Sequence, residues 1–487
     1  MSSTSPPAPK RQLRTRVLTN TVVVIGGRAI AIGFSAVATS LLARYLGSEE
    51  LGEFSAVFAY MSLFGWLATF GIESILVRET SRERASAGSI VRTGVALMTI
   101  LCVATTILAL FIAPHAGYRD KLLVLVAIAT IDTLIAPLRL PGLVFQVDLQ
   151  QWYSVGINVI RQALWLGAII ALREYHAPIA YVVGARVAVA AVEALLIWFA
   201  SRRFVSANSR ILWHKAPHFI KESFPIAIST LLGGVYLRID QVMLHNMVSD
   251  RVLGQYAAAV KVSELFETAP SALLFSMAPI LSVAAAAQHQ FQIYQSRTFR
   301  YLNVCAAALC VVITAGAPLI VKWLYGPKFA AAAPLLEILI WSEVSVFFGA
   351  LVLTLLVARN LQRYLMVPTA AGAISNVLLN LYLIPRYSAT GAAIATVASY
   401  SIGWMVILLF FPETRPTIYD GWKTALPALL IAAASVWIAS LLPFGDVLRV
   451  VAGLSTFIVG TLLTGLIHRE DVAFAWSAVA GMFARAG

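Results

Sequence analysis

The stretch LGEFSAV, residues 51–57, recurs as LGQYAAA at residues 253–259, and each copy opens a long apolar run after a short polar turn. A second pair of markers, LQQW at 149–152 and LQRY at 361–364, repeats in the same order. The two offsets, 202 and 212 residues, agree within the length of one loop insertion. These repeats predict two copies of one structural unit.

The composition is that of a polytopic membrane protein. Of the 487 residues, 60% are apolar and only 12% are charged, and the mean hydropathy is +0.82, all far from the values of ordinary soluble domains. A spanning helix needs about 20 mostly apolar residues. The apolar runs predict about fourteen spans, at residues 17–43, 51–72, 88–112, 120–145, 152–172, 178–200, 219–247, 254–282, 298–324, 331–358, 364–384, 389–411, 421–442 and 447–467.

The predicted fold is all-α, with two six-helix bundles and two further C-terminal helices. Each unit has an even number of spans, so both copies face the same way and are related by a pseudo-two-fold axis along the membrane normal. The space between the bundles is the natural place for a substrate. The predicted parts are a disordered cytoplasmic tail at 1–16, bundles at 17–200 and 219–411, a basic cytoplasmic linker at 201–218, and two helices with a short cytoplasmic tail at 412–487.

The distribution of Lys and Arg predicts the orientation of the chain. Counted on alternate sides of the spans, 21 lie on the side of the N-terminus, 9 on the other side and 6 within spans. Positive residues collect on cytoplasmic flanks, so both termini are predicted to be cytoplasmic. This sidedness also accounts for the net charge of +13. A nucleic-acid partner is not expected, because the chain has no soluble domain in which to build a groove.

The three cysteines, Cys102, Cys305 and Cys310, all lie inside apolar runs. Their positions match neither a disulfide framework nor a metal-ligand spacing. No metal, cofactor or catalytic residue is predicted.

The stretch VYLRIDQVML, residues 235–244, places Arg238 and Asp240 inside one predicted span. Residues two apart on a helix point about 200° away from each other, so they do not form a local pair. Together they cost about 5–7 kcal/mol in hydrocarbon, whereas the nine aliphatic residues between 225 and 247 return only about 3–5 kcal/mol. This imbalance predicts that the charged face lines a water-filled cavity.

Other predicted spans carry charges in the same way. They are Arg28 in the first span, Asp132 and Arg139 in the fourth, Arg161 in the fifth, Arg186 and Glu193 in the sixth, and Lys261, Glu264 and Glu267 in the eighth. Arginine binds phosphate through two parallel hydrogen bonds and stays charged when desolvated. A cavity lined in this way suits a lipid carrier with a phosphate or pyrophosphate head.

Each charge also has a structural interpretation. Arg28 and Arg238 could contact phosphate, pair with an acid on a neighbouring helix, or reach toward an interface. For Asp132, Arg139, Arg161, Arg186 and Glu193, structural pairing is the favoured interpretation. Asp240, Glu264 or Glu267 could titrate and couple transport to protons, as possible ion-coupling residues, but pairing with Arg238 or Lys261 is favoured.

Several longer motifs resemble the bacterial polysaccharide flippases, the Wzx-type branch of the multidrug/oligosaccharidyl-lipid/polysaccharide (MOP) exporter superfamily. In the first unit these are LLARYLGSEELGEFSAVFAY and GIESILVRE. In the second unit they are FPIAISTLLGGVYLRIDQVML, LGQYAAAVKVSE, MAPILS, LYGPKFAAAAPLLEIL and ATGAAIATVASY. The resemblance extends over essentially the whole chain.

The resemblance implies two six-helix bundles around a central cavity. It implies that the protein flips an undecaprenyl-pyrophosphate-linked oligosaccharide across the bacterial cytoplasmic (inner) membrane by alternating access, in the synthesis of O-antigen, capsule or exopolysaccharide. The family's arginine-lined cavity carries over to Arg28 and Arg238, and less directly to Arg161 and Arg186. The implied partners are the lipid-linked substrate and membrane lipids, with a polysaccharide polymerase as a candidate protein partner.

Alternatives remain within and outside the superfamily. A peptidoglycan lipid II flippase also uses basic cavity residues, whereas drug exporters usually present fewer arginines. The rival class is a membrane enzyme of the same pathway, such as a polymerase, a ligase or a glycosyltransferase. Such enzymes are expected to carry catalytic groups in a sizeable outer loop, and the predicted outer loops here are short. The sequence therefore predicts a transporter and not an enzyme.

Overall fold

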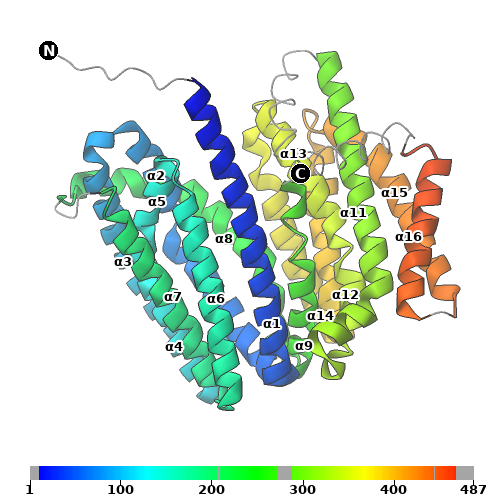
Figure 1. Cartoon of the computed structure of the whole chain (residues 1–487), viewed down its shortest axis with the longest axis horizontal. Helices are drawn as coiled ribbons and strands as arrows, with labels where there is room; N and C mark the ends of the chain where they lie inside the picture. The colour runs from blue at the N-terminus through cyan, green and yellow to red at the C-terminus, as the bar shows by residue number, and fades with distance from the viewer. Residues whose placement is uncertain (1–9, 206–208, 272–273, 275–287, 444, 468–487) are drawn as a thin grey trace. The chain divides into compact units, whose positions relative to one another are not determined.

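The computed structural model describes residues 10–205, 209–271, 274, 288–443 and 445–467 (Figure 1). Every element within these ranges is helical and none is a strand. Eleven helical stretches in them are long and apolar enough to cross a membrane. The predicted all-α, polytopic fold is confirmed.

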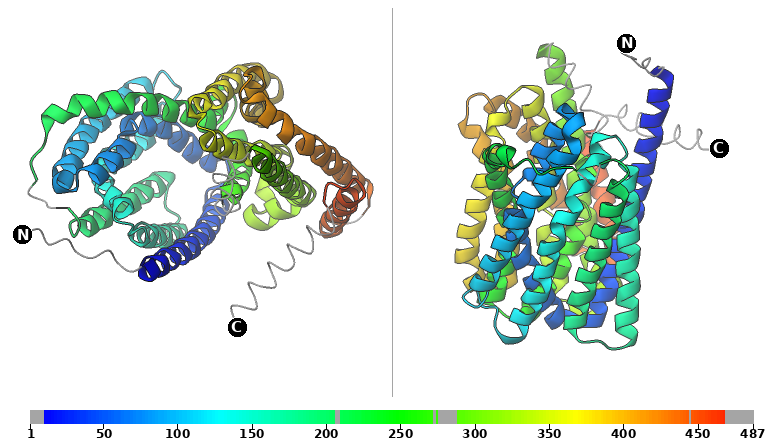
Figure 2. Two further views of the ribbon diagram at one scale, coloured as in Figure 1. Left: turned by 90° about the horizontal axis from the view of Figure 1, so that it is seen from above. Right: turned by 90° about the vertical axis from the view of Figure 1, so that its left-hand side faces the viewer.

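The chain divides into two compact units, Met1–Asn246 and Met247–Gly487. Many of the long helices of the first unit run roughly parallel, as the right-hand view of Figure 2 shows. The main helices that begin in the first unit are α1 (Lys10–Thr69), α2 (Ile72–Arg82), α3 (Ala87–Ile112), α4 (Asp120–Ile135), the 3-10 helix η2 (Ala136–Gly142), α5 (Leu143–Val147), α6 (Trp152–Glu174), α7 (Ile179–Ser201) and α8 (Ala216–Met247).

The second unit continues with α9 and ends, in the described part, with α16. Its α-helices are α9 (Asp250–Ser263), α11 (Gln288–Tyr325), α12 (Ala332–Leu339), α13 (Ser342–Ala358), α14 (Met366–Ser401), α15 (Arg415–Leu441) and α16 (Asp446–Leu463). A π-helical turn (Ile402–Val406) and a 3-10 turn (Ile407–Phe410) extend α14.

Two of the long helices each contain two predicted spans. In α1 the helix breaks at Gly47, where φ is 72° and ψ is −178°, a conformation that is essentially restricted to glycine. In α14 it breaks at Ser388, where φ is 54°. Both breaks lie between spans that the sequence predicts as separate. The predicted span 254–282 falls partly outside the described residues, and the total of fourteen stays a prediction.

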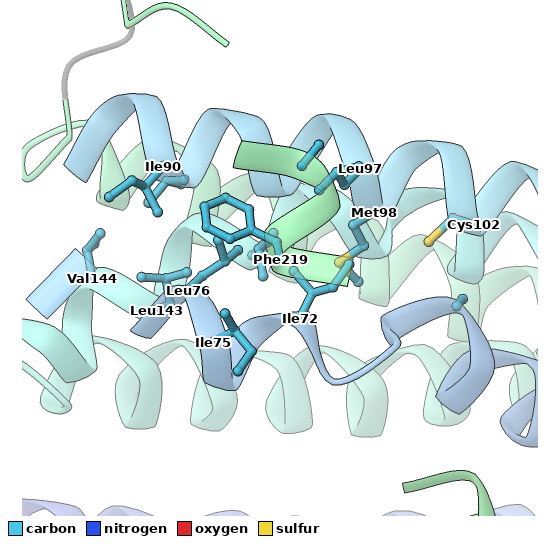
Figure 3. Close-up of a cluster of buried hydrophobic side chains, with 14 of the residues drawn as sticks. Ile72, Ile75, Leu76, Ile90, Leu97, Met98, Cys102, Leu143, Val144 and Phe219 are labelled. Atoms are coloured by element: carbon cyan, nitrogen blue, oxygen red, sulfur yellow. The ribbon is translucent and has the colours of Figure 1, made fainter. Parts of the chain in front are cut away.

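The beginning of α8 packs inside the first unit. Phe219 is fully buried among Ile72 and Leu76 of α2, Leu97 of α3 and Leu143 of α5 (Figure 3). Close packing of this kind holds helices together in a membrane, where lipid competes for every apolar surface. The whole of α8 except its last residue therefore belongs to the first unit, although the sequence repeat assigns it to the second. The predicted boundaries at 200 and 219 stay predictions.

The two C-terminal helices pack on α11. Val304, Ala307 and Val311 of α11 form one apolar cluster with Ala428 and Ala432 of α15 and with Phe457 of α16. Small residues at these positions let the helix backbones approach closely. The added pair α15 and α16 is therefore an integral part of the second unit.

We expect Gly234→Ala to lower the thermal stability of the purified protein. A Cβ at Gly234 of α8 would lie 1.8 Å from Cε3 of Trp66 in α1, which must then move. Overpacking of this kind costs about 1–3 kcal/mol, against a gain of about 1 kcal/mol in helix propensity.

The matched control is Gly167→Ala in α6, because a Cβ there meets nothing within 4 Å. Gly167→Ala gains helix propensity without a steric clash, so the midpoint of thermal unfolding of this variant should not fall. Equal midpoints for the two variants would contradict the packing of α8 on α1.

Candidate functional site

Five charged side chains meet at membrane depth in the first unit. This charged cluster consists of Asp132 of α4, Arg139 of η2, Arg161 of α6, and Arg186 and Glu193 of α7. Each residue is at least seven positions from either end of its candidate span, which places it about 10 Å or more inside the span. Charges at this depth are costly unless they pair or serve a ligand.

Two prolines shape the segment that carries Arg139. Pro137 and Pro141 lack the N–H that an α-helix needs, and α4 gives way at Ile135 to the 3-10 helix η2. A 3-10 stretch turns more tightly than an α-helix. Here it positions Arg139 so that it pairs with Asp132 in its own span and reaches Glu193 on α7.

Glu193 is shared by two arginines from different helices. Its Oε1 lies 3.0 Å from Nε of Arg161, and its Oε2 lies 3.6 Å from Nε of Arg139. Arg139 also pairs with Asp132, and Arg161 donates a hydrogen bond to Oδ1 of Asn158 at 2.8 Å. The pairing predicted for these residues is present, but Glu193 pairs across helices and not with Arg186, seven residues before it on α7.

Arg186 has an aromatic partner in place of a carboxylate. Its guanidinium carbon lies 5.4 Å from the centre of the Trp165 ring, within the range of a cation–π contact. It interacts electrostatically with all four other members of the cluster. Within the described ranges, Arg186 forms no ion pair. Three guanidinium groups thus meet two carboxylates, and the cluster carries one excess positive charge.

The charged cluster is not sealed. The side chains of its ion pairs are between 19% and 39% exposed, so another molecule can approach them. A partly open site with excess positive charge and unused guanidinium donors can bind an anionic group, and guanidinium geometry favours phosphate or carboxylate. Acid–base chemistry needs a different arrangement, because arginine does not give up its proton.

Two of the four arginines predicted to contact substrate, Arg161 and Arg186, lie together in the charged cluster. Arg28 is exposed on α1, next to Gly27, whose backbone packs on Val155 of α6. Arg238 is half-buried on α8, and Asp240 on the same helix is 5% exposed and accepts a hydrogen bond from the backbone N–H of Gln241. Contact of any of these arginines with substrate stays a prediction.

The acids predicted to couple transport to ions lie in different units. Asp240 belongs to α8 in the first unit. Glu264 and Glu267 lie in the turns that follow α9 in the second, and Glu264 pairs with Lys261 at 2.6 Å. That pair is the structural interpretation that the spacing favours. In the described part of the chain, no group of three or more His, Cys, Asp or Glu side chains could hold a metal ion.

Two features of the structure are not evident from single-span spacing. In the sequence, Trp165 is one of many apolar residues of α6. Its role as a cation–π partner of Arg186 is visible only in the structure. Glu343 of α13 is only 1% exposed, and it is not among the predicted site residues. The sequence does contain an indication of it, because an acidic residue inside a predicted span is a candidate functional group by default.

The sequence profile of the family described as polysaccharide biosynthesis protein matches residues 17–285. Among curated proteins, the probable flippase AglR of Haloferax volcanii is 27% identical over 235 residues. That alignment covers 46% of this chain and 49% of AglR, so the chain spans about half the length of this relative.

Among solved structures, the lipid II flippase MurJ in an inward closed conformation matches with a TM-score of 0.70 and 15% identity, covering 91% of this chain and 98% of MurJ. An inward-facing multidrug resistance MATE family transporter of the MOP superfamily matches with a TM-score of 0.61 and 15% identity, covering 82% and 99%. The chain thus has the fold of that superfamily, and these relatives are transporters and not enzymes, as the sequence predicts. Because the family profile covers more than half of its length, the chain belongs to the polysaccharide biosynthesis protein family.

Proposed function

We propose that this protein flips a lipid-linked oligosaccharide across the bacterial cytoplasmic membrane, with an undecaprenyl-pyrophosphate carrier as the substrate class. The observation that carries the proposal is the charged cluster, which holds more arginine than acid at membrane depth in a partly exposed site. The family description, the name of AglR and the likeness to MurJ support the same class of transport.

The physical task of such a transporter is to bring a charged head group through hydrocarbon. An isolated charge at the bilayer centre costs about 2.5–3.5 kcal/mol on the insertion scale, and more by other measures. A pyrophosphate carries more than one charge, so it needs fixed cations along its path. The polyprenyl tail can stay in lipid while the head and the sugars pass through water, and no covalent step is required.

The members of the charged cluster then have different roles. Glu193 holds Arg139 and Arg161 in place, and Asp132 restrains Arg139 from the other side. The guanidinium of Arg186 contacts the Trp165 ring and forms no ion pair among the described residues, so its N–H donors are not committed to a carboxylate. Arg186 is therefore our candidate for the first contact with phosphate, and Arg161 for the second.

Arg28 and Arg238 are proposed to contact the head group at other points of the path. Arg28 is exposed on α1, and Arg238 is half-buried on α8 beside Asp240. Both lie in candidate spans. Transport by alternating access needs cations at more than one level, since the head group must be held at each stage.

A lipid II flippase is the second candidate, because the likeness to MurJ extends over nearly all of that protein. Both substrates present a polyprenyl pyrophosphate, and they differ in the attached sugars. The charged cluster serves either one. Assays that compare the two substrates therefore distinguish these candidates.

Replacing Arg186 by Ala should reduce flipping of a fluorescent polyprenyl-pyrophosphate oligosaccharide in vesicles by about tenfold or more. A hydrogen bond to a charged group contributes about 1.5–3 kcal/mol, and 1.4 kcal/mol corresponds to about tenfold. Arg186→Lys should recover part of the flipping rate, because lysine restores the positive charge but not the two parallel hydrogen bonds of the guanidinium group. The measurement is the fraction of label that a membrane-impermeant quencher reaches over time.

Arg173→Ala is the matched control, since Arg173 is an exposed arginine at the end of α6, outside the charged cluster. It should stay within about twofold of the wild-type rate, as expected for a surface substitution. Wild-type flipping by Arg186→Ala would remove Arg186 from the proposed path.

Glu193→Gln should lower the midpoint of thermal unfolding as well as the flipping rate, because two arginines lose the carboxylate they share. Leaving a partly buried charged group without its partner costs about 1–3 kcal/mol. Asp132→Asn should have a smaller effect on stability, since Asp132 contacts Arg139 alone and is 39% exposed. If Asp132→Asn destabilises the protein more than Glu193→Gln, Glu193 is not the organising residue.

In cells, Arg28→Ala and Arg238→Ala should each abolish export of the polymer while the protein remains in the membrane. The reason is the loss of a fixed cation along the path of the head group. Export is measured as surface polysaccharide, and protein level by immunoblot of the membrane fraction. Full export by both variants would limit the path to the charged cluster.

A further inference from the structure

One carboxylic acid lies deep inside the second unit and has no charged partner among the described residues. Glu343 of α13 is 1% exposed and lies well inside the candidate span Ala332–Ala358. Ser263 of α9 donates a hydrogen bond to its Oε1 at 3.1 Å. Its Oε2 is buried and has no hydrogen-bond partner among the described residues. A buried carboxylate with a single partner is strongly disfavoured as a charge, so the neutral acid is the form that fits this site.

Apart from the Ser263 hydroxyl and the helix N-terminus, which favour the anion, the described groups that face Glu343 do not offset a negative charge. Its electrostatic neighbours in the described part are Glu267, in the turns after α9, and the thiol of Cys310 on α11. The nearest basic residue along α9, Lys261, pairs with Glu264. Glu337 is the other acid of this span, one element earlier in α12. The position of Glu343 in the first turn of α13 favours the anion somewhat, because the helix N-terminus is positive.

The backbone is interrupted on both sides of the Ser263–Glu343 contact. Helix α9 ends at Ser263 and gives way to turns at residues 264–268. The span of Glu343 breaks between Leu339 of α12 and Ser342 of α13, and the carbonyl freed at Ile340 accepts a bond from the thiol of Cys310. Irregular backbone at membrane depth is tolerated only in a protein interior or beside a water-filled space. Two interruptions that meet at one buried acid form a place where helix segments can shift.

We propose that Glu343 is the proton-binding residue of the transport cycle, and that its hydrogen bond with Ser263 joins the two interrupted helices while the acid is protonated. In the course of the cycle Glu343 releases its proton to water and takes one up again from water. The negative charge left behind repels Glu267 and draws in water, which replaces the Ser263 hydroxyl as hydrogen-bond donor to Glu343 and so separates α9 from α13. This inference rests on the proposed function, because it supplies the driving ion for that transport.

A proton fits the site better than a metal ion. A metal ion needs several oxygen ligands, and the described residues provide only the carboxylate of Glu343 and the hydroxyl of Ser263 at this point. A proton needs no cage of ligands. Glu264 and Glu267, which the sequence predicts as coupling residues, lie in the adjoining turns and would tune the site electrostatically.

The first test compares Glu343→Gln with wild type in vesicles under an imposed pH gradient. The substitution keeps the shape of the protonated acid but cannot release a proton. Wild-type flipping should depend on the gradient, whereas flipping by Glu343→Gln should proceed at a rate that the gradient does not change. Glu337→Gln is the matched control and should keep the wild-type dependence. A wild-type rate that follows a sodium gradient and ignores pH would overturn the proposal, as would a full pH response in Glu343→Gln.

The second test does not depend on flipping. The infrared difference spectrum between wild type and Glu343→Gln, at neutral pH and without substrate, should contain the carbonyl stretch of one protonated carboxylic acid. Absence of that band means that Glu343 is ionised, which would overturn the proposal. If the band is present but no lipid-linked saccharide is flipped, the proposed function fails while the proton-binding site stands.

Discussion

The carboxylate of Glu193, shared between Arg139 and Arg161, is the interaction on which the arrangement of charges in the first unit depends. Guanidinium groups repel one another at membrane depth, and an acid between two of them turns the repulsion into attraction. The shared carboxylate ties η2, α6 and α7 together. Because Glu193 is committed to these two arginines, Arg186 remains on Trp165 and has no carboxylate partner in the part of the chain that the structure describes. The excess charge that a phosphate can use therefore follows from a structural ion pair.

Interrupted helices place the polar groups in both units. In the first unit, two prolines turn the end of α4 into η2 and direct Arg139 at its partners. In the second unit, the breaks after Ser263 and after Leu339 meet at Glu343. Regular apolar helices satisfy their own backbone and offer little to a substrate or an ion. The irregular segments position the charged and polar side chains, and the regular helices cross the membrane.

Much of the fold could be predicted from the sequence, because lipid imposes strict requirements on length and polarity. The breaks at Gly47 and Ser388 lie between predicted spans, since polar residues interrupt the apolar runs there. The assignment of α8 to the first unit could not be predicted. It depends on how Phe219 fits among side chains of three other helices, and one-dimensional repeats carry no information on such packing.

The candidate site was predictable in its residue types but not in its pairing. Charges inside spans are conspicuous in any sequence, so Asp132, Arg161 and Arg186 are predicted as site residues. Which acid meets which arginine depends on helix rotation, and Glu193 pairs across helices and not along its own face. Glu343 is not predicted as a site residue, because nothing along the chain distinguishes it from Glu337. Only burial and the contact with Ser263 do so.

The most direct test of the central claim is an experimental density map of the protein with a bound polyprenyl-pyrophosphate oligosaccharide. The proposed mechanism predicts pyrophosphate density within hydrogen-bond distance of the Arg186 guanidinium, with Glu193 still between Arg139 and Arg161. A head group bound far from Arg186, with the charged cluster closed to it, would contradict the proposal.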